Sequence, residues 1–478
     1  MTYDVAVVGA GPAGMSAALS AADAGLSVLV VDEQLRAGGQ IFRQPPVEFS
    51  DSALAPTAGY GWAADLLERF ENHFGITHLA SSTAYGILRD RDEGTLSLKL
   101  AVAGPTVNGA VAVKRVLIAT GAFDMPVAFP GWTLPGVMTA GAVQSLLKSQ
   151  HVLAGDDLVL AGSHPLLIIV ADQLVKKGAR VSELAFARGI PAPRELIAAR
   201  RAIPGHTALL AESSRALVRL VSRGVTVSTK TIVTGAFGDR AVESVELAKV
   251  DKQWNASTER RRRTASTLVL GYGFSPSTEL ARQADCEMVW HSPKGGWVVA
   301  HDERMSTSAP GIFVAGEPTG VAGAEQSRAE GHLAGLSIAR ELSAPRAPTT
   351  TVLAQANSAL KGATRFSTVV QSMFEPQRQA LAQLATPETT ICRCELVTCE
   401  TVQRTLSDNP FISTASAVKL QCRSGMGPCQ GRYCEGTISA LVANERHTSP
   451  REAGHFTAHL PVKPVPVQTL GALDRDLQ

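Results

Sequence analysis

Residues 4–14 read Asp4-Val-Ala-Val-Val-Gly9-Ala-Gly11-Pro-Ala-Gly14, and this stretch decides the fold of the first part of the chain. Its apolar run predicts a buried parallel strand, and the glycines after it predict a tight turn. Residues 15–24 contain no proline or glycine and are rich in alanine, which favours a helix. A second apolar run, residues 28–31, ends at Asp32 and Glu33. This order of elements is typical of a dinucleotide-binding βαβ unit.

Each residue of the glycine turn has a physical role in the predicted site. Gly9 allows the tight turn, Gly11 lets the backbone approach a pyrophosphate, and Gly14 lets the helix pack close to the strand. Pro12 and Ala13 begin the helix, whose free N–H groups and partial positive charge face the phosphates. Asp32, the first acid after the second strand, can accept hydrogen bonds from ribose hydroxyls. Glu33 is predicted to lie in the same site. The alternative is a degenerate turn that binds no ligand.

Two later stretches indicate that the dinucleotide is FAD. Gly39 and Gln40 lie in a glycine-rich loop after the second strand, where paired glycines let the chain fold under an isoalloxazine ring. An ordinary glycine turn is the alternative for this loop. Another apolar strand ends at Ala119, Thr120 and Gly121, a sequence that commonly closes the first nucleotide domain of flavoproteins with two dinucleotide domains.

A third stretch returns the chain to the first domain. Residues 310–317 form an apolar strand that ends at Gly316 and Glu317. In flavoproteins an aspartate here accepts a ribityl hydroxyl, and Glu317 would do so with a longer arm. Gly323 and Ala324 open the next helix, whose N-terminus can face the N1–O2 edge of a reduced flavin. A plain strand–turn–helix is the alternative.

A second βαβ unit begins at residues 158–162, but its glycine pattern is damaged. His164 stands at the second glycine position, where its side chain would occupy the space of a pyrophosphate, and Leu167 stands at the third. The following strand ends near Ala185 without a ribose acceptor or a partner for a 2′-phosphate. The sequence therefore predicts a second nucleotide fold without normal NAD(P)H binding. A site that uses His164 on a phosphate is the alternative.

Six of the seven cysteines lie after residue 390, and four of them form two close pairs separated by thirty-four residues. In a cytosolic chain, clustered cysteines favour metal binding over disulfides. Four thiolates in two pairs suit a [2Fe–2S] cluster or a tetrahedral zinc, and beside a flavin we favour the electron carrier. Cys399 and Cys422 are read as ordinary thiols, with Cys422 as the main rival ligand. The predicted ligands are Cys392, Cys394, Cys429 and Cys434.

Charge and hydropathy exclude several other classes of function. The net charge of +2 argues against a general nucleic-acid binder, and the run of arginines at residues 260–263 is read as a solvated hairpin tip. No signal peptide and no uninterrupted membrane-spanning run is visible; the best candidate, residues 158–175, is broken by polar residues. The chain is expected in the cytoplasm, with peripheral membrane association through partners left open.

Composition shifts divide the chain into five parts. A linker rich in proline, alanine and threonine follows residue 342, and a proline-rich tail that cannot be helical follows the cysteines. The predicted parts are an FAD domain (1–128 and 300–342), a second Rossmann-like domain (129–299), a helical linker (343–385), a [2Fe–2S] domain (386–450) and an extended arm (451–478).

Together these motifs resemble a known family. The first two domains look like the α/β flavoproteins of the glutathione-reductase and thioredoxin-reductase type. Nearly the whole chain is similar to the α subunits of heteromeric amino-acid and opine dehydrogenases, which include octopine and nopaline oxidases, hydroxyproline and proline dehydrogenases and the hydrogen cyanide synthase subunit. The most specific segments are Phe129-Pro-Gly-Trp-Thr-Leu-Pro-Gly136, Cys392-Arg-Cys-Glu395 and Gly425-Met-Gly-Pro-Cys-Gln-Gly-Arg432.

The resemblance implies an electron-transfer subunit. It implies FAD in the first domain, a C-terminal domain like bacterioferritin-associated ferredoxin that holds a [2Fe–2S] cluster, and a β subunit similar to D-amino-acid oxidase with its own flavin. A small third subunit is a further implied partner, and electrons would pass to a quinone or another acceptor. Two features depart from the pattern: His164 stands where related chains generally keep glycine, and Cys422 stands at a position that is not usually cysteine.

The main hypothesis is oxidation of an N-substituted amino acid on the partner subunit, with electrons carried through this chain. No convincing acid–base pair for substrate oxidation is visible, so the catalytic residues are unknown. Three alternatives remain: a self-contained NAD(P)H-dependent reductase that feeds the cluster, a subunit of the hydrogen cyanide synthase type that acts on glycine, and a scaffold subunit with relic sites. The absence of CxxC from the second domain excludes a thioredoxin-reductase disulfide mechanism.

Overall fold

The predicted βαβ unit opens the fold. In the computed structural model, which describes residues 2–46, 49, 60–92, 95–189, 195, 200 and 206–477, strands β1 and β2 are parallel and α1 joins them. Every residue of β2 is buried, as the continuous apolar run predicts for an inner parallel strand. The bounds are β1 (Tyr3–Val8), α1 (Pro12–Asp23) and β2 (Val28–Val31).

This unit lies inside a seven-stranded mixed sheet. The strand order is β3-β2-β1-β6-β5-β4, and β19 pairs with β6. Strands β3, β2, β1, β6 and β19 run parallel, whereas β4, β5 and β6 form an antiparallel meander. The remaining bounds are α2 (Ala63–Glu71), β3 (Ile76–Leu79), β4 (Thr83–Asp92), β5 (Thr95–Ala103), β6 (Asn108–Ile118) and β19 (Ile312–Val314).

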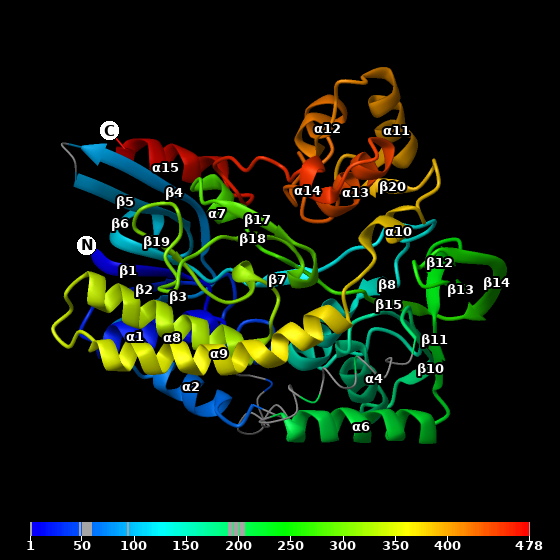
Figure 1. Cartoon of the computed structure of the whole chain (residues 1–478), viewed down its shortest axis with the longest axis horizontal. Helices are drawn as coiled ribbons and strands as arrows, with labels where there is room; N and C mark the ends of the chain where they lie inside the picture. The colour runs from blue at the N-terminus through cyan, green and yellow to red at the C-terminus, as the bar shows by residue number, and fades with distance from the viewer. Residues whose placement is uncertain are drawn as a thin grey trace.

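Helices α1, α8 (Ala324–Glu341) and α9 (Thr350–Met373) lie together on one side of this sheet (Figure 1). Two glycines let α8 approach α1 closely. A Cβ atom at Gly331 would lie 2.0 Å from the carbonyl oxygen of Ala13, and one at Gly335 would lie 2.4 Å from that of Ala17. Any larger residue there would push the helix that follows Glu317 away from the helix that follows the glycine turn.

The second βαβ unit forms a separate parallel sheet with strand order β11-β10-β9-β15-β8. An antiparallel sheet of β12, β13 and β14 lies beside it. The bounds are β8 (Val137–Thr139), α3 (Ala140–Ser145), η2 (Leu146–Gln150), β9 (Asp157–Gly162), α4 (Leu166–Lys176), β10 (Arg180–Phe186), α6 (Thr207–Ser222), β11 (Thr226–Thr229), β12 (Thr231–Phe237), β13 (Ser244–Val250), β14 (Ala256–Thr264) and β15 (Thr267–Gly271).

The arginine run at residues 260–263 is not a hairpin tip, which corrects the sequence-based interpretation. It lies within edge strand β14, and alternate side chains point toward β10. Arg261 and Arg263 both donate to the carboxylate of Glu183, whose side chain is fully buried; the Arg263 Nε–Glu183 Oε2 distance is 2.9 Å. The run therefore compensates a buried charge, and strand periodicity decides which arginines reach it.

Replacing Glu183 with glutamine should destabilise the second domain. Burial alone would raise the pKa of Glu183, but hydrogen bonds from Arg261, Ser228 and Arg263 outweigh it and hold the pKa at about 2. The folded-state pKa is thus depressed, so this contribution is present above about pH 4.5 and is lost as the pH falls toward 2. Because both guanidinium groups are more than one third exposed, we expect a loss of about 2 kcal/mol at pH 7.

Urea unfolding at pH 7 and at pH 3 checks this expectation. The difference in midpoint between wild type and Glu183→Gln should shrink at the lower pH. At pH 3 Glu183 is protonated in the unfolded chain but still mostly ionised in the folded one, so folding must remove its proton. Arg240→Gln, at an exposed position in the bend before β13, is the control and should leave the midpoint unchanged. An equal difference at both pH values would contradict the ion-pair interpretation.

The second domain ends earlier than residue 299, the boundary predicted from sequence. Strand β16 returns to pair with β7, and Leu280, Ala281 and Cys286 are buried in the core under the first sheet, together with Ala6 and Val8. The chain therefore crosses back to the first domain soon after β15. The bounds are β7 (Ala122–Asp124), β16 (Phe274–Pro276), α7 (Glu279–Gln283), β17 (Met288–His291), η3 (Ser292–Lys294), β18 (Gly296–Val299) and η4 (Glu317–Thr319).

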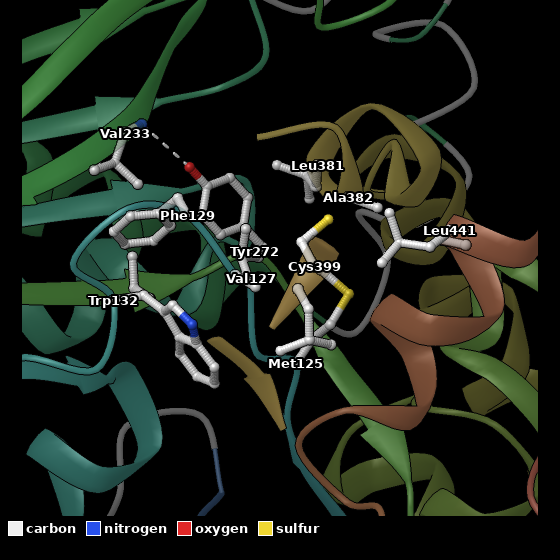
Figure 2. Packing of buried hydrophobic residues seen from close by; sticks show 14 of the residues in the cluster. Met125, Val127, Phe129, Trp132, Val233, Tyr272, Leu381, Ala382, Cys399 and Leu441 are labelled. Atoms are coloured by element: carbon white, nitrogen blue, oxygen red, sulfur yellow. Dashed lines mark hydrogen bonds between the residues drawn. The ribbon is translucent and has the colours of Figure 1, made fainter. Parts of the chain in front are cut away.

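Residues 386–450, called the cysteine-rich segment below, form a small helical lobe (Figure 1). The lobe shares a hydrophobic core with the second domain, since one cluster holds Val233 and Tyr272 of that domain together with Cys399 and Leu441 of the lobe (Figure 2). The bounds of this region are α10 (Arg378–Ala382), β20 (Thr390–Cys392), β21 (Val397–Thr398), α11 (Cys399–Asp408), α12 (Ala415–Cys422) and α13 (Glu435–Glu445).

The tail differs from the predicted extended arm. It contains the short helix α14 (Pro450–Ala453) and ends in α15 (Val467–Leu477), which lies beside the β4–β6 meander (Figure 1). Only the proline-rich part between them is extended, and there Val462 donates its N–H to the carbonyl of Tyr85. The prolines prevent a helix until Val467, after which no proline follows and an amphipathic sequence continues.

Candidate functional site

Two glycines of the first turn are required by close contacts with the backbone of neighbouring segments. Gly9 has φ +106°, and a Cβ atom there would lie 2.3 Å from the carbonyl oxygen of Ala119. A Cβ atom at Gly14 would lie 1.8 Å from the carbonyl oxygen of Gly9. The end of β6 and the first turn of α1 are therefore in direct contact with the glycine turn, as the roles predicted from sequence require.

Gly11 differs, because the protein leaves the space beside it free. A Cβ atom at Gly11 would meet only the Cα atom of Gly39, at 3.9 Å. Gly11 is the N-cap of α1 and provides no side-chain cap, while Pro12 occupies the first turn. The helix N-terminus thus presents N–H groups that no side chain caps, beside the Gly39 loop that packs against Gly11, and such an N-terminus fits the pyrophosphate of a dinucleotide.

The two acids after β2 have different surroundings. Asp32 accepts hydrogen bonds from the backbone N–H of Ala10 at 2.5 Å and of Gln34 at 2.7 Å, and burial raises its pKa. Its carboxylate therefore braces the glycine turn. Glu33 is half-exposed and pairs with Lys463 of the tail at 2.9 Å. Asp32 as the ribose acceptor, with Glu33 in the same site, stays a prediction.

The Gly39 loop and the end of β6 lie next to the turn. Gly39 has φ +60°, and Gln40 donates its side-chain N–H to the carbonyl of Ala122 at 2.7 Å. The hydroxyl of Thr120 donates to the carbonyl of Ser277 at 2.6 Å. Gly121 has φ +73°, and a Cβ atom there would point into open space, with nothing beyond its chain neighbours within 4 Å. The structure thus brings the predicted residues of all these segments to one edge of the sheet.

Two buried carboxylates accept backbone N–H groups in the third predicted segment, residues 316–324. Glu317 accepts the N–H of Gly323 at 2.9 Å, so its carboxylate lies at the N-terminus of α8, which Ala324 begins; burial raises the pKa of Glu317 to about 7. Glu330 accepts the N–H of Gly316 at 2.7 Å. Sequence reasoning missed Glu330; a charged residue on the apolar face of the predicted helix was the available signal.

The second βαβ unit has a blocked helix N-terminus. The Nδ1 atom of His164 accepts the N–H of Leu166 at 3.2 Å, and its ring packs edge-on against Phe274. Burial lowers the pKa of His164 to about 4, so the imidazole is neutral at physiological pH. Leu167 fills the contact between strand and helix, since Cβ atoms at Gly162 and Gly271 would lie within 3 Å of it. The imidazole therefore takes the position where a phosphate would bind.

The four predicted cysteine ligands come together in pairs. Cys392 lies close enough to Cys434, and Cys394 to Cys429, for the two thiols of each pair to influence each other's pKa, and electrostatic interactions link the two pairs. The Cys434 thiol and the backbone N–H of Gly425, 3.4 Å from the Cys392 sulfur, lower the pKa of Cys392 to about 5. Four thiols in two pairs, one of them with a lowered pKa, are the donor types that a [2Fe–2S] cluster uses, and the ligand assignment stays a prediction.

Within the described residues, no group of three or more His, Cys, Asp or Glu side chains is placed so that it could hold a metal ion, so the [2Fe–2S] site stays a prediction. The rival thiols are used elsewhere. The Cys422 sulfur contacts the carbonyl of Val418 at 3.2 Å and the Ser424 hydroxyl at 3.3 Å, and Cys399 is buried in the shared hydrophobic core. The pairing therefore separates the four predicted ligands from the other two cysteines.

Phe456 holds the glycine-rich loop that carries Cys429. Cβ atoms at Gly425 and Gly431 would lie 2.3 Å and 2.4 Å from its ring, and both glycines have positive φ. A Cβ atom at Gly427 would lie 2.2 Å from the Cβ atom of Cys394. The loop thus has no room for a side chain at any of these three glycines. Sequence reasoning did not find Phe456, which lies outside the cysteine motif.

Comparison with known proteins agrees with this arrangement. Residues 3–331 match the pyridine nucleotide-disulphide oxidoreductase family. The chain is 33% identical to the A subunit of an opine oxidase from Rhizobium meliloti, over 98% of this chain and 88% of that protein. It is 32% identical to the hydrogen cyanide synthase subunit HcnB of Pseudomonas aeruginosa over 96% of each chain.

The fold also resembles a solved structure, L-proline dehydrogenase from P. horikoshii. The TM-score is 0.68 at 19% identity, and the match covers 98% of this chain and 79% of that one. The predicted two-domain flavoprotein fold and the suspected family are confirmed, and the family supports FAD as the cofactor. No described helix is long and apolar enough to cross a membrane. The chain is an oxidoreductase of the pyridine nucleotide-disulphide oxidoreductase family, and its relatives there include opine oxidase A subunits and hydrogen cyanide synthase HcnB.

Proposed function

We propose that this chain is the electron-transfer subunit of a heteromeric dehydrogenase that oxidises an amino acid, an imino acid or an opine. It holds FAD at the Gly9–Gly14 turn and a [2Fe–2S] cluster on the four paired cysteines. The pairing of Cys392 with Cys434 and of Cys394 with Cys429, in a lobe packed against the flavoprotein domains, carries this proposal. The two cofactors would supply the redox chemistry, and the protein holds them and sets their surroundings.

The partner in this proposal is a subunit similar to D-amino-acid oxidase that carries its own flavin and the substrate pocket. The proposed system is completed by a small third subunit, with a quinone or another compound as the electron acceptor. The names of the relatives as subunits support a heteromer. Because those relatives include an opine oxidase and a cyanide-forming synthase, the substrate is a secondary amine or glycine, and assays of the co-expressed complex with each class would distinguish them.

The purified chain provides the direct test. Flavin absorbance together with two iron atoms and two acid-labile sulfides per chain is expected, with an electron paramagnetic resonance signal after reduction. Co-expression with a D-amino-acid-oxidase-like protein encoded beside it should yield a stable complex with amine dehydrogenase activity. Protein that contains neither flavin nor iron would support the scaffold alternative instead.

NADH should not reduce the flavin rapidly. The neutral imidazole of His164 occupies the N-terminus of α4, so the pyrophosphate of a nicotinamide dinucleotide loses its backbone donors there. Anaerobic stopped-flow mixing with NADH and with NADPH measures this, and dithionite serves as the positive control. Rapid bleaching of the flavin by either nucleotide would show that the self-contained reductase is the correct function.

A further inference from the structure

A pocket lies where the cysteine-rich segment meets the flavoprotein domains. Its volume is about 80 Å³, room for several water-sized groups. Its walls come from the β7–β16 crossover, the β17–β18 hairpin, α10 and the start of α13. We call it the interface pocket and define it by Phe123, Glu279, Arg282, Trp297, Arg378 and Glu435. None of the residues assigned to FAD or to the cysteine cluster lines it.

The charges around the interface pocket do not balance. Arg282 pairs with Glu435 at 2.7 Å, and Arg432, which also lines the pocket, pairs with Glu279 at 3.3 Å. Arg378 forms no ion pair with any described carboxylate. Three guanidinium groups of the pocket lining therefore face two lining carboxylates, which leaves Arg378 without an ion-pair partner among the described side chains.

The surroundings of Arg378 make that charge costly. Its Nη2 atom donates to the carbonyls of Gly295 at 2.8 Å and Phe274 at 3.5 Å, whereas Glu375 attracts it only at longer range. Burial lowers the pKa of Arg378 to about 10, so it remains charged at neutral pH. A buried cation is normally paired with an anion. The free energy lost when the cation is removed from water is larger than the free energy gained from hydrogen bonds to carbonyl groups.

Several donors at the pocket also lack partners. Within the described chain, the Nε atoms of Arg282 and Arg378 and the indole Nε1 of Trp297 are buried and make no hydrogen bond. Each unpaired buried donor costs on the order of 1–3 kcal/mol. These donor atoms are shielded from solvent, but they belong to side chains that line one small pocket. Together with Arg378, which has no described ion-pair partner, they give the pocket an excess of donors, which suits an acceptor that carries a negative charge.

We propose that the interface pocket binds a small monocarboxylate of about three to five carbons, with its carboxylate at Arg378. A guanidinium matches a carboxylate in planar, two-pronged geometry. A single unpaired positive charge, with Glu279 and Glu435 nearby, disfavours a dianion such as phosphate. The apolar wall, which includes Phe123 and Leu381, suits a short carbon chain. The proposal does not rest on the proposed electron-transfer function, although Arg432 and Glu435 of the pocket stand close to Cys434 in the chain.

Isothermal titration calorimetry on the full-length protein, as purified, tests the proposal with sodium propionate as the probe. Propionate should bind saturably with one site per chain. Propionamide, which has nearly the same shape and no charge, should bind about tenfold more weakly or worse. Sodium phosphate should not bind at the same site. Equal binding of propionamide, or tighter binding of phosphate that competes with propionate, would overturn the assignment.

Two substitutions at Arg378 locate the site. Arg378→Gln should weaken propionate at least about tenfold, whereas Arg378→Lys, which keeps the charge, should weaken it less. Arg446→Gln is the matched control, because Arg446 also donates only to carbonyls, among them that of Leu406 at 2.6 Å, and lies outside the pocket.

Thermal unfolding separates a binding defect from a folding defect. Propionate should raise the midpoint of wild type and Arg446→Gln but not of Arg378→Gln. No saturable binding to the wild type, or unchanged affinity in a folded Arg378→Gln protein, would refute the proposal. The flavin and iron contents are measured on the same samples, so loss of the carboxylate site and failure of the electron-transfer proposal give different results.

Discussion

Cys429→Ser should remove the iron and acid-labile sulfide from the purified protein while leaving the flavin in place. Cys429 lies near Cys394. The loop that carries Cys429 is held in place because Gly427 packs against Cys394 and Gly431 packs against Phe456, so another residue of the loop cannot move in to replace the lost ligand. A serine hydroxyl stays protonated near neutral pH and is a poor ligand for iron. Iron analysis and the visible spectrum measure the loss.

Cys422→Ser is the matched control for this experiment. Its sulfur contacts Val418 and Ser424 at the end of α12 instead of the four paired thiols. The variant should therefore keep wild-type iron, sulfide and electron paramagnetic resonance signals. An intact cluster in Cys429→Ser, or its loss in Cys422→Ser, would contradict the ligand assignment and make Cys422 a ligand in place of Cys429.

Gly11→Ala should give a folded protein that has lost most of its flavin. The added methyl group would meet only one protein atom, at 3.9 Å, so the fold can accept it. It would occupy the gap at the N-terminus of α1, where the pyrophosphate approaches the backbone. We expect FAD affinity to fall at least about a hundredfold, roughly 3 kcal/mol, as several backbone hydrogen bonds to the phosphates are disturbed.

The measurement is the ratio of flavin to protein after purification, with circular dichroism to confirm the fold. Gly14→Ala provides the contrast, because its methyl group would lie 1.8 Å from the carbonyl oxygen of Gly9. That variant should lose thermal stability as well as flavin. If Gly11→Ala retained full flavin with unchanged affinity, the dinucleotide would have to bind elsewhere.

The parts of the site that depend on local backbone geometry were predictable from sequence. Gly9 and Gly14 follow from steric rules that act within one strand–turn–helix unit, and the structure shows both in the close backbone contacts expected of them, whereas the role of Gly11 toward a pyrophosphate stays a prediction. The defect at His164 was visible for the same reason. Paired cysteine spacing likewise indicated which thiols could meet.

The parts that depend on distant segments were not predictable. Phe456 reaches the cysteine loop and Lys463 reaches Glu33 only because the tail returns across the molecule, and no local pattern marks either residue. The role of the arginine run at residues 260–263 depends on a buried carboxylate in another strand, Glu183. The return of the chain near residue 274 depended on pairing between two three-residue strands, too short to give a periodic signal.

The position of the tail has a consequence for the order of events during synthesis. Val462 is buried in the core that contains Ala6, and Leu473 is buried with Tyr85. The ribosome makes the glycine turn and the central strands long before it makes these residues, by roughly 20–70 s at ordinary rates of translation. The first sheet therefore keeps part of its surface uncovered until Leu473 has emerged from the ribosome.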